Sequence, residues 1–260
     1  MKQRPAIWAV IGLLVFGTIW EAFVRIGDIK PFALLEPSRI LRALAEDPAF
    51  YLRTTWSTAW HTLIGVGIGL VVAVVVGAAL AAVRRLEWAV QPILVLIMVT
   101  PWVAYITSVV LLLGAGTPTI LFMVAFVTFP PFVFATVVGL RSADVSAREV
   151  FASIEASPVD VFWRLRLPSA LPSLFTAARF SVGLGLAAAF FAEGGSASSV
   201  PGLGATAART RGNQTLGAPL LWGSILCSTL LGIALLLALT MLERKMLKWH
   251  ASQRFSIGKH

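Results

Sequence analysis

Long uninterrupted runs of apolar residues limit what this chain can fold into. A helix needs roughly 20 apolar residues to cross the hydrocarbon core of a bilayer. Six segments are that long: 6–24, 58–83, 88–113, 119–138, 175–192 and 220–242. Only 13% of the 260 residues are charged, whereas an ordinary soluble domain has about 25%. The sequence therefore predicts an all-α membrane protein with about six transmembrane helices, in a single domain over residues 1–260.

Several classes of function lack the residues they need. The single cysteine, Cys227, lies in an apolar run and offers no disulfide or metal site, so we expect it to serve packing. Two of the three histidines lie in the C-terminal tail, and no cluster of catalytic residues is apparent. No G-x-x-x-x-G-K-[ST] loop occurs to hold nucleotide phosphates. We therefore predict that the chain is not an enzyme and binds no metal or cofactor itself.

The basic residues indicate topology rather than a nucleic-acid partner. The net charge is +9, but the charges are dispersed between the apolar runs instead of forming one patch. With the N-terminus inside, thirteen basic residues fall on inner segments and six on outer ones. The positive-inside rule then places both termini in the cytoplasm. No small-residue cleavage site closes residues 1–16, so we expect a retained first helix rather than a signal peptide.

The inner segment 141–174 is too polar to lie in lipid. We expect two short helices in it, at 145–157 and 158–165, the second capped by Ser157 with Pro158 at its first position. Leu167-Pro168 is expected to end the second helix. The first helix places Val150, Ile154 and Phe151 on one side. Such a cytoplasmic helix pair is suited to docking a soluble partner.

Other segments allow two interpretations each. A short helix at 38–45, capped by Ser38, is expected on the outer membrane surface. Gly65 and Gly69 give a smooth helix face, which we assign to packing within one subunit rather than between subunits. Pro101 and Pro130-Pro131 interrupt two spans, either lining a pathway or as ordinary membrane-helix prolines. The basic tail 243–260 is either an interfacial segment attracted to anionic lipid or a solvated end.

Ionisable residues in spans are functional candidates because lipid burial of a charge is expensive. Arg179 either snorkels to the cytoplasmic interface or attracts an anionic solute. Glu193 is either a solvated helix end or a group that closes the pathway or contacts a binding protein. His61 is interpreted as an interfacial hydrogen-bonding residue rather than a ligand.

The inner segment also carries a family motif. Glu149-Val-Phe, three residues, Glu155, nine residues and then Leu165-Arg-Leu-Pro168 resembles the EAA loop of binding-protein-dependent ABC importer permeases. The resemblance implies that this loop is the coupling helix that docks on an ATP-hydrolysing subunit. The implied coupling residues are Glu149, Val150, Ile154, Glu155, Ala156, Ser157, Leu165, Leu167 and Pro168.

The resemblance extends over roughly residues 39–243 to the nitrate, taurine, aliphatic-sulfonate and thiamine-precursor permease branch. Stretches that carry it include Gly139-Leu-Arg-Ser-Ala-Asp144, Ala192-Glu193 and Gly202-Leu-Gly204. It implies a type I ABC importer permease in the bacterial inner membrane. The implied partners are two ATP-hydrolysing subunits that use ATP and Mg, an identical or homologous second permease, and an extracytoplasmic solute-binding protein. The implied translocation path is lined by Thr100, Pro101, Trp102, Tyr105, Arg179, Phe190 and Glu193.

Four positions depart from the family pattern. Glu155 replaces the loop glycine, Val150 and Phe151 replace two alanines, and Thr107 replaces a proline, so the turn between the short helices could be shaped differently. The alternative function is a secondary transporter or channel not driven by ATP, which would need intramembrane ion sites or an internal repeat. The sequence leaves the solute, and the choice between homodimer and heterodimer, open.

Overall fold

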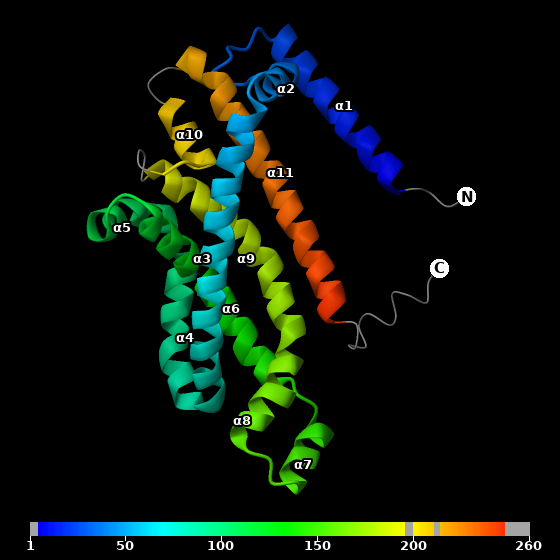
Figure 1. Ribbon diagram of the computed structural model, residues 1–260, viewed down its shortest axis with the longest axis vertical. Coiled ribbons are helices and arrows are strands. Elements are labelled where there is room, and N and C mark those ends of the chain that lie inside the picture. Colours follow the sequence, from blue (N-terminus) through cyan, green and yellow to red (C-terminus); the bar gives the residue numbers. More distant parts are fainter. Residues whose placement is uncertain (1–4, 196–199, 211–213, 248–260) are drawn as a thin grey trace.

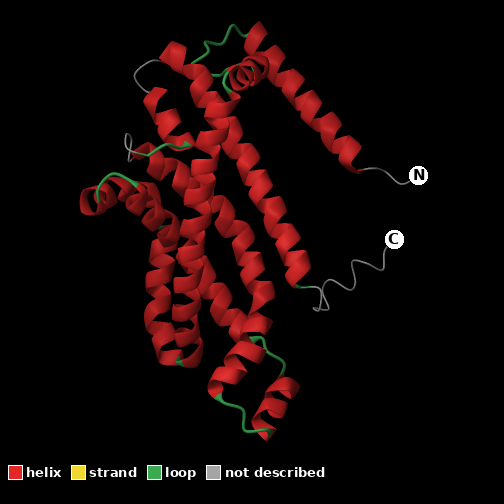
Figure 2. Ribbon diagram, viewed as in Figure 1, coloured by secondary structure: helices red, strands yellow, loops and turns green. Residues whose placement is uncertain are grey.

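The computed structural model describes residues 5–195, 200–210 and 214–247, and within these ranges the chain is helical with short connections (Figures 1 and 2). The elements are α1 (Pro5–Ile26), α2 (Pro37–Glu46), α3 (Pro48–Ala82), α4 (Arg84–Val99), the 3₁₀ turn η1 (Trp102–Tyr105), α5 (Ile106–Leu113), α6 (Thr117–Arg141), α7 (Val145–Ser153), α8 (Pro158–Val161), the π turn η2 (Phe162–Arg166), α9 (Leu167–Gly195), α10 (Leu203–Arg209) and α11 (Gln214–Met246). Five helices are long and apolar enough to cross a membrane, and the bent pair of α4 with η1–α5 makes a sixth. The prediction of an all-α membrane fold is confirmed.

The long helices run between two ends of the molecule. We call the end with α7 and α8 the loop end, and the end with α2 and α10 the far end (Figure 1). The first residues of α1 and the last residues of α11 both point toward the loop end (Figure 1). Of the basic tail, residues 248–260 lie outside the described residues.

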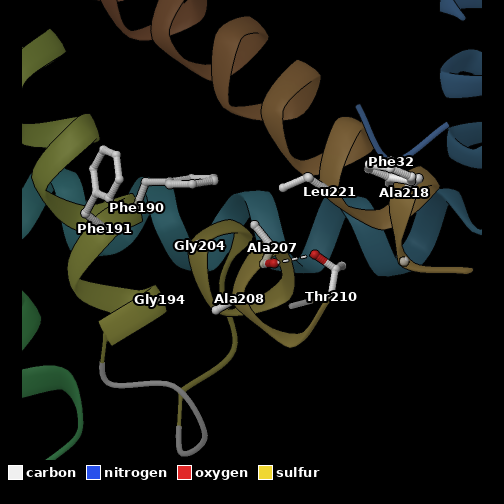
Figure 3. Close-up of a pocket in the computed structure, with 11 residues that line it drawn as sticks. Phe32, Phe190, Phe191, Gly194, Gly204, Ala207, Ala208, Thr210, Ala218 and Leu221 are labelled. Atoms are coloured by element: carbon white, nitrogen blue, oxygen red, sulfur yellow. Dashed lines mark hydrogen bonds between the residues drawn. The ribbon is translucent and has the colours of Figure 1, made fainter. Parts of the chain in front are cut away.

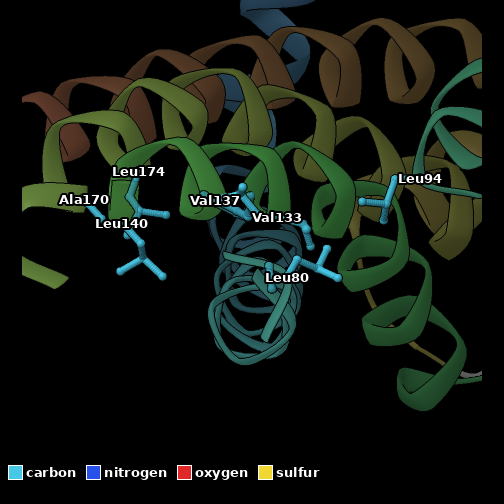
Figure 4. Close-up of a cluster of buried hydrophobic side chains, with 9 residues drawn as sticks. Leu80, Leu94, Val133, Val137, Leu140, Ala170 and Leu174 are labelled. Atoms are coloured by element: carbon cyan, nitrogen blue, oxygen red, sulfur yellow. The ribbon is translucent and has the colours of Figure 1, made fainter. Parts of the chain in front are cut away.

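The core forms around α6, because this helix is covered on most sides. Of its most apolar stretch 56% is buried, against 6% for α1 and α11, which expose apolar side chains as lipid-facing helices do. One buried cluster joins α3, α4, α6 and α9 (Figure 4). Its members are Ala73, Leu80, Leu94, Phe132, Val133, Val137, Leu140, Ala170 and Leu174. Cys227 is buried beside Tyr51 and Leu203, as its packing role predicted.

The α3 glycines let α3 and α6 approach closely. A Cβ on Gly65 would lie 2.5 Å from the Val124 Cβ, and one on Gly69 would lie 2.5 Å from the Thr128 hydroxyl. These distances are too short for any side chain, so the helix axes can be this close only with glycine. Packing within one subunit, the interpretation we preferred for this pair, is confirmed.

The predicted interruption of segment 88–113 at Pro101 is confirmed, because the chain bends by 89° between α4 and η1, at Thr100 and Pro101. One predicted helix end is wrong. Leu167-Pro168 does not end a helix, since one helical run continues from Pro158 to Gly195. The Leu167 N–H donates to the Phe162 carbonyl, five residues back, and this widened π turn lets the helix pass the proline. Pro130 and Pro131 lie inside α6 without ending it.

Several element ends also differ from prediction. Helix α3 begins at Pro48, ten residues before the predicted span, capped by the Asp47 carboxylate. Helix α2 begins at Pro37, so Ser38 lies inside it and is not its cap. The Ser38 hydroxyl and N–H instead donate to Glu21 of α1, at 2.7 and 3.0 Å. A carboxylate from another helix thus supplies the acceptor that we assigned to Ser38.

Candidate functional site: the α7–α8 loop and the far-end network

Helix α7 starts from a firm cap. The Asp144 side chain accepts hydrogen bonds from the Ser146 and Ala147 N–H groups at the first turn of α7. The Ser146 hydroxyl bond, then the two N–H bonds, hold the pKa of Asp144 below its ordinary value of 3.8. The stability contributed by this cap is therefore complete above pH 3.8 and is lost only as the pH falls through the lowered pKa.

Helix α7 ends in a turn that ordinarily takes glycine. Glu155 has φ of 50°, in the left-handed region. The Glu155 N–H donates to Ala152 at 3.1 Å and the Ala156 N–H to Phe151 at 3.0 Å, the pattern of a Schellman motif. Glu155 stands where the motif that this loop resembles has glycine, and it adopts the left-handed backbone that glycine favours. For a residue with a Cβ this conformation is unfavourable by roughly 1–2 kcal/mol.

Large apolar side chains stand exposed around this turn. They are Val145, Val150 and Ile154 of α7 and its cap, and Val159 and Trp163 of α8 and η2, each 59–67% exposed. We call these five side chains the loop surface. Glu149 beside them is exposed and has no hydrogen-bond or ion-pair partner among the described residues. Exposed apolar groups in a segment this polar are typical of a surface that binds another protein.

The remaining predicted coupling residues support the loop rather than forming its surface. Ser157 caps α8 by accepting from the Asp160 N–H at 3.1 Å, as predicted. Ala156, Leu167 and Pro168 are half-buried. Leu165 is buried, 9% exposed, so it cannot contact a partner directly in this conformation.

At the far end a carboxylate is enclosed between three helices. Glu193 of α9 is 1% exposed. It lies 2.8 Å from His61 Nδ1 of α3, and it accepts from the Thr58 hydroxyl at 2.9 Å and the Gly204 N–H at 3.0 Å. The Thr58 hydroxyl also accepts from the Leu203 N–H at 2.9 Å. We call these groups the far-end network, and they fasten α10 to α3 and α9.

The far-end network decides between the interpretations given above for Glu193 and His61. Glu193 is not a solvated helix end, and His61 is a hydrogen-bonding residue that lies inside the protein rather than at an interface. A buried carboxylate is tolerated when it is hydrogen-bonded on both oxygens, as here. When Glu193 is ionised it can only accept, so His61 carries its proton on Nδ1.

The Gly202-Leu-Gly204 stretch is explained by this packing. A Cβ on Gly204 would lie 1.8 Å from the Phe190 carbonyl oxygen, and one on Gly202 would lie 2.3 Å from the Glu193 carboxylate. Only glycine allows the backbone to come this close. Sequence reasoning quoted these glycines but missed their contact with Glu193, because the three residues meet only in the folded chain.

The structure does not gather the predicted pathway residues at one place. Trp102, just after the bend, packs edge-on against Phe191 of α9 with ring centroids 5.8 Å apart. Tyr105 packs against Phe126 at 6.1 Å, and the Thr100 hydroxyl bonds back to Leu96 at 2.7 Å. Arg179 lies toward the loop end of α9, where its Nε donates to Glu243 of α11 at 3.1 Å. The Arg179 charge therefore has a partner within the chain.

Phe190 lines a cavity of about 430 Å³ between α9, α10 and α11. Figure 3 shows its ring extending from α9 toward Leu221 of α11. The cavity walls are mostly apolar, with Ala207, Ala208 and the Thr210 hydroxyl on the α10 side. The Thr210 hydroxyl donates to the Ala207 carbonyl at 2.7 Å, so it is already satisfied.

The fold is a multi-span helical bundle with exposed apolar side chains on a polar loop at one end. The family model for the inner membrane component of binding-protein-dependent transport systems matches residues 65–248, and the chain belongs to this family. It is the permease subunit of an ABC importer, as its similarity to such subunits over nearly the whole chain shows.

The similar proteins include the taurine transport system permease protein TauC of Escherichia coli K12, 25% identical over 95% of this chain and 91% of TauC. The formylaminopyrimidine transport permease protein ThiX of Halalkalibacterium halodurans is 28% identical over 97% and 99%. The putative aliphatic sulfonates transport permease protein SsuC of E. coli K12 is 30% identical over 95% and 92%. A chain of the inward-facing MetNI methionine ABC transporter shares the fold, with a TM-score of 0.63 at 18% identity over 76% and 96%.

Proposed function

We propose that this chain works in the bacterial inner membrane, both termini in the cytoplasm, as one of two permease subunits of an importer. Two ATP-hydrolysing subunits dock at the loop end, and an extracytoplasmic binding protein delivers solute at the far end. ATP and Mg act in the docked subunits, and this chain supplies the membrane path. The solute is a small molecule, as are the taurine and formylaminopyrimidine in the names of similar proteins.

The loop surface is the observation that carries this proposal. A loop rich in both charges lies in water, where five exposed large apolar side chains are unfavourable unless a partner covers them. Glu149 beside them, which pairs with none of the described residues, offers a carboxylate for a basic group on that partner. The two capped helix ends and the Schellman turn hold these side chains in place before docking.

The helix that follows the loop provides a route for force. One run from Pro158 to Gly195 leads from the loop surface to Glu193 in the far-end network. A displacement of the loop by the ATP-hydrolysing subunits would therefore move the far end of α9 directly. Alternating access follows if this motion opens and closes a path beside the bend at Pro101, where Trp102 meets Phe191.

Co-purification from native membranes in mild detergent tests this proposal. The wild-type chain should retain an ATPase whose hydrolysis rises with the binding protein and its solute. Glu149→Arg should release most of that ATPase, because it reverses the exposed charge at the docking surface. Glu46→Arg, the same change on an exposed carboxylate of α2 at the far end, is the matched control and should retain it. A chain that purifies alone and moves solute in liposomes without ATP would overturn the proposal in favour of a secondary transporter.

A further inference from the structure

Arg141 joins four helix ends at the loop end. It is the last residue of α6. Its guanidinium forks onto Glu87 in the first turn of α4, at 3.1 and 2.7 Å, and also reaches the Leu80 and Ala81 carbonyls at the end of α3, at 3.2 and 3.4 Å. Its own carbonyl accepts from Arg148 of α7 at 2.5 Å. Arg141 thus connects the α7–α8 loop to the corner where α3 ends and α4 begins.

The charges at this corner fit the helix ends they meet. The guanidinium lies at the carboxyl end of α3 and the Glu87 carboxylate at the amino end of α4, each favourable to its helix dipole. A two-bond fork fixes direction as well as distance, which lysine cannot reproduce. The Arg141 side chain is 40% exposed and the Glu87 side chain 22% exposed. Water therefore screens this ion pair, and it adds little to the stability of the fold. The Arg141–Glu87 pair is notable for the fixed geometry of its two bonds rather than for its contribution to stability.

Helix α4 is held loosely elsewhere. Of its residues Arg84–Val99, the structure buries only Leu94. Beyond Thr100 the chain bends by 89°, so α4 ends at the bend where Trp102 meets α9. Packing leaves α4 freer to shift than α6, and the Glu87 fork is its strongest polar tie to the loop end.

We propose that Arg141 is a positioning residue for transport, which transmits displacement of α7 to α4 through Glu87. A push on the loop surface reaches Arg148, then the Arg141 backbone, then Glu87, and tilts α4 at the bend. The α9 route and this one leave the loop in different directions and converge at Trp102 and Phe191. This inference rests on the importer function proposed above.

The test uses the complete complex with its own ATPase and binding protein, reconstituted in proteoliposomes. The measured quantity is solute moved per ATP hydrolysed, which a merely structural role would not change once the complex has assembled. Arg141→Ala should lower it by about fivefold or more, the lower limit of ordinary coupling between sites. Arg141→Lys should give a ratio of solute to ATP between those of wild type and Arg141→Ala, since lysine keeps the charge but cannot make the two-bond fork. Arg85→Ala, an exposed arginine of the same corner outside the bridge, is the control and should match wild type.

A double-mutant cycle then separates coupling from general damage. Glu87→Ala should equal Arg141→Ala, and the double variant should be no worse than either, because both open one bridge. Unchanged solute per ATP in Arg141→Ala would overturn the inference while the importer function stands. A wild-type complex without ATP-dependent transport would overturn both. If Arg141→Ala fails to assemble, Glu87→Ala decides by the same ratio.

Discussion

The two ends of this molecule differ in which side chains they bury: the far end encloses a polar network, and the loop end exposes apolar side chains. In the far-end network, the His61 imidazole and the Thr58 hydroxyl are buried and both bond to the buried Glu193 carboxylate. At the loop end, valines, an isoleucine and a tryptophan are exposed beside Glu149, which has no partner in the part of the chain that the structure describes. The far-end network is therefore closed on itself, whereas the loop surface is the docking surface that we propose for another protein.

The contrast separates stability from partner binding. Removing a far-end group leaves others buried without partners, so the folded state suffers. Removing a side chain of the loop surface leaves no buried group without a partner. The stability of the isolated chain should therefore be unchanged, whereas the complex with the ATPase should be weakened. A variant that lowers both equally would show that the two ends are not divided in this way.

The largest expected effect is Glu193→Ala. It leaves His61 Nδ1 and the Gly204 N–H buried without their acceptor, whereas the Thr58 hydroxyl keeps its bond to the Thr54 carbonyl at 3.2 Å. We expect a loss of about 3–5 kcal/mol in the free energy of unfolding, the range for a buried pair that loses one member. Unfolding by SDS titration in mixed micelles measures it.

Glu149→Ala is the control for Glu193→Ala, since it removes the same group from the loop surface. Its unfolding should match wild type within about 0.5 kcal/mol, as for most surface changes. Equal stability of the Glu193→Ala and Glu149→Ala chains would break the division between the two ends.

The next effect comes from Gly204→Ala, which adds one methyl group where the Phe190 carbonyl lies 1.8 Å away. We expect about 1–3 kcal/mol of destabilisation, as for other overpacked sites. Gly67→Ala in α3 is matched to it, because no atom lies within 4 Å of the added Cβ. That variant should be neutral or more stable by up to about 1 kcal/mol, measured in the same titration. An equally tolerant Gly204 would mean that α10 is not held against α9.

The sequence predicted the elements that depend on local pattern. Apolar runs located six spans, and Ser157 with Pro158 located the start of α8, because caps and spans are set by neighbouring residues. The resemblance located the family and the loop. The glycine of the motif also indicated the backbone conformation at this position, since Glu155, which replaces it here, adopts the left-handed conformation that glycine favours.

Contacts between distant segments could not be predicted in this way. Glu193 lies 132 residues from His61 in sequence, and Arg141 lies 54 from Glu87. Nothing in the local pattern pairs these residues. The π turn at Phe162 was missed for a related reason, since Pro168 normally ends a helix and only the widened turn before it allows the run to continue.

A third, smaller effect concerns the loop surface alone. Ile154→Ala removes an apolar side chain that is 66% exposed in this chain and that the proposed docking would cover. We expect affinity for the ATPase to fall about tenfold, the magnitude of one truncated interface residue of moderate weight. Leu41→Ala, an equally exposed residue of α2 at the far end, should leave affinity unchanged. Titration of the purified ATPase into the detergent-solubilised chain measures both, and equal loss in the two variants would contradict the assignment of the docking surface.

The smallest effect tests whether Glu155 acts through its backbone or its charge. Glu155→Gly relieves the left-handed strain at φ of 50°, but glycine also gains entropy in the unfolded chain, so the net gain should stay below about 1 kcal/mol. Glu155→Ala keeps the strain and removes only the charge. Limited proteolysis of the loop compares the variants: slower cleavage of Glu155→Gly alone indicates strain, whereas a change shared by both indicates the charge. Faster cleavage of Glu155→Gly would mean that the side chain itself holds the turn, and that the loop end, like the far end, depends on a contact that the motif alone does not predict.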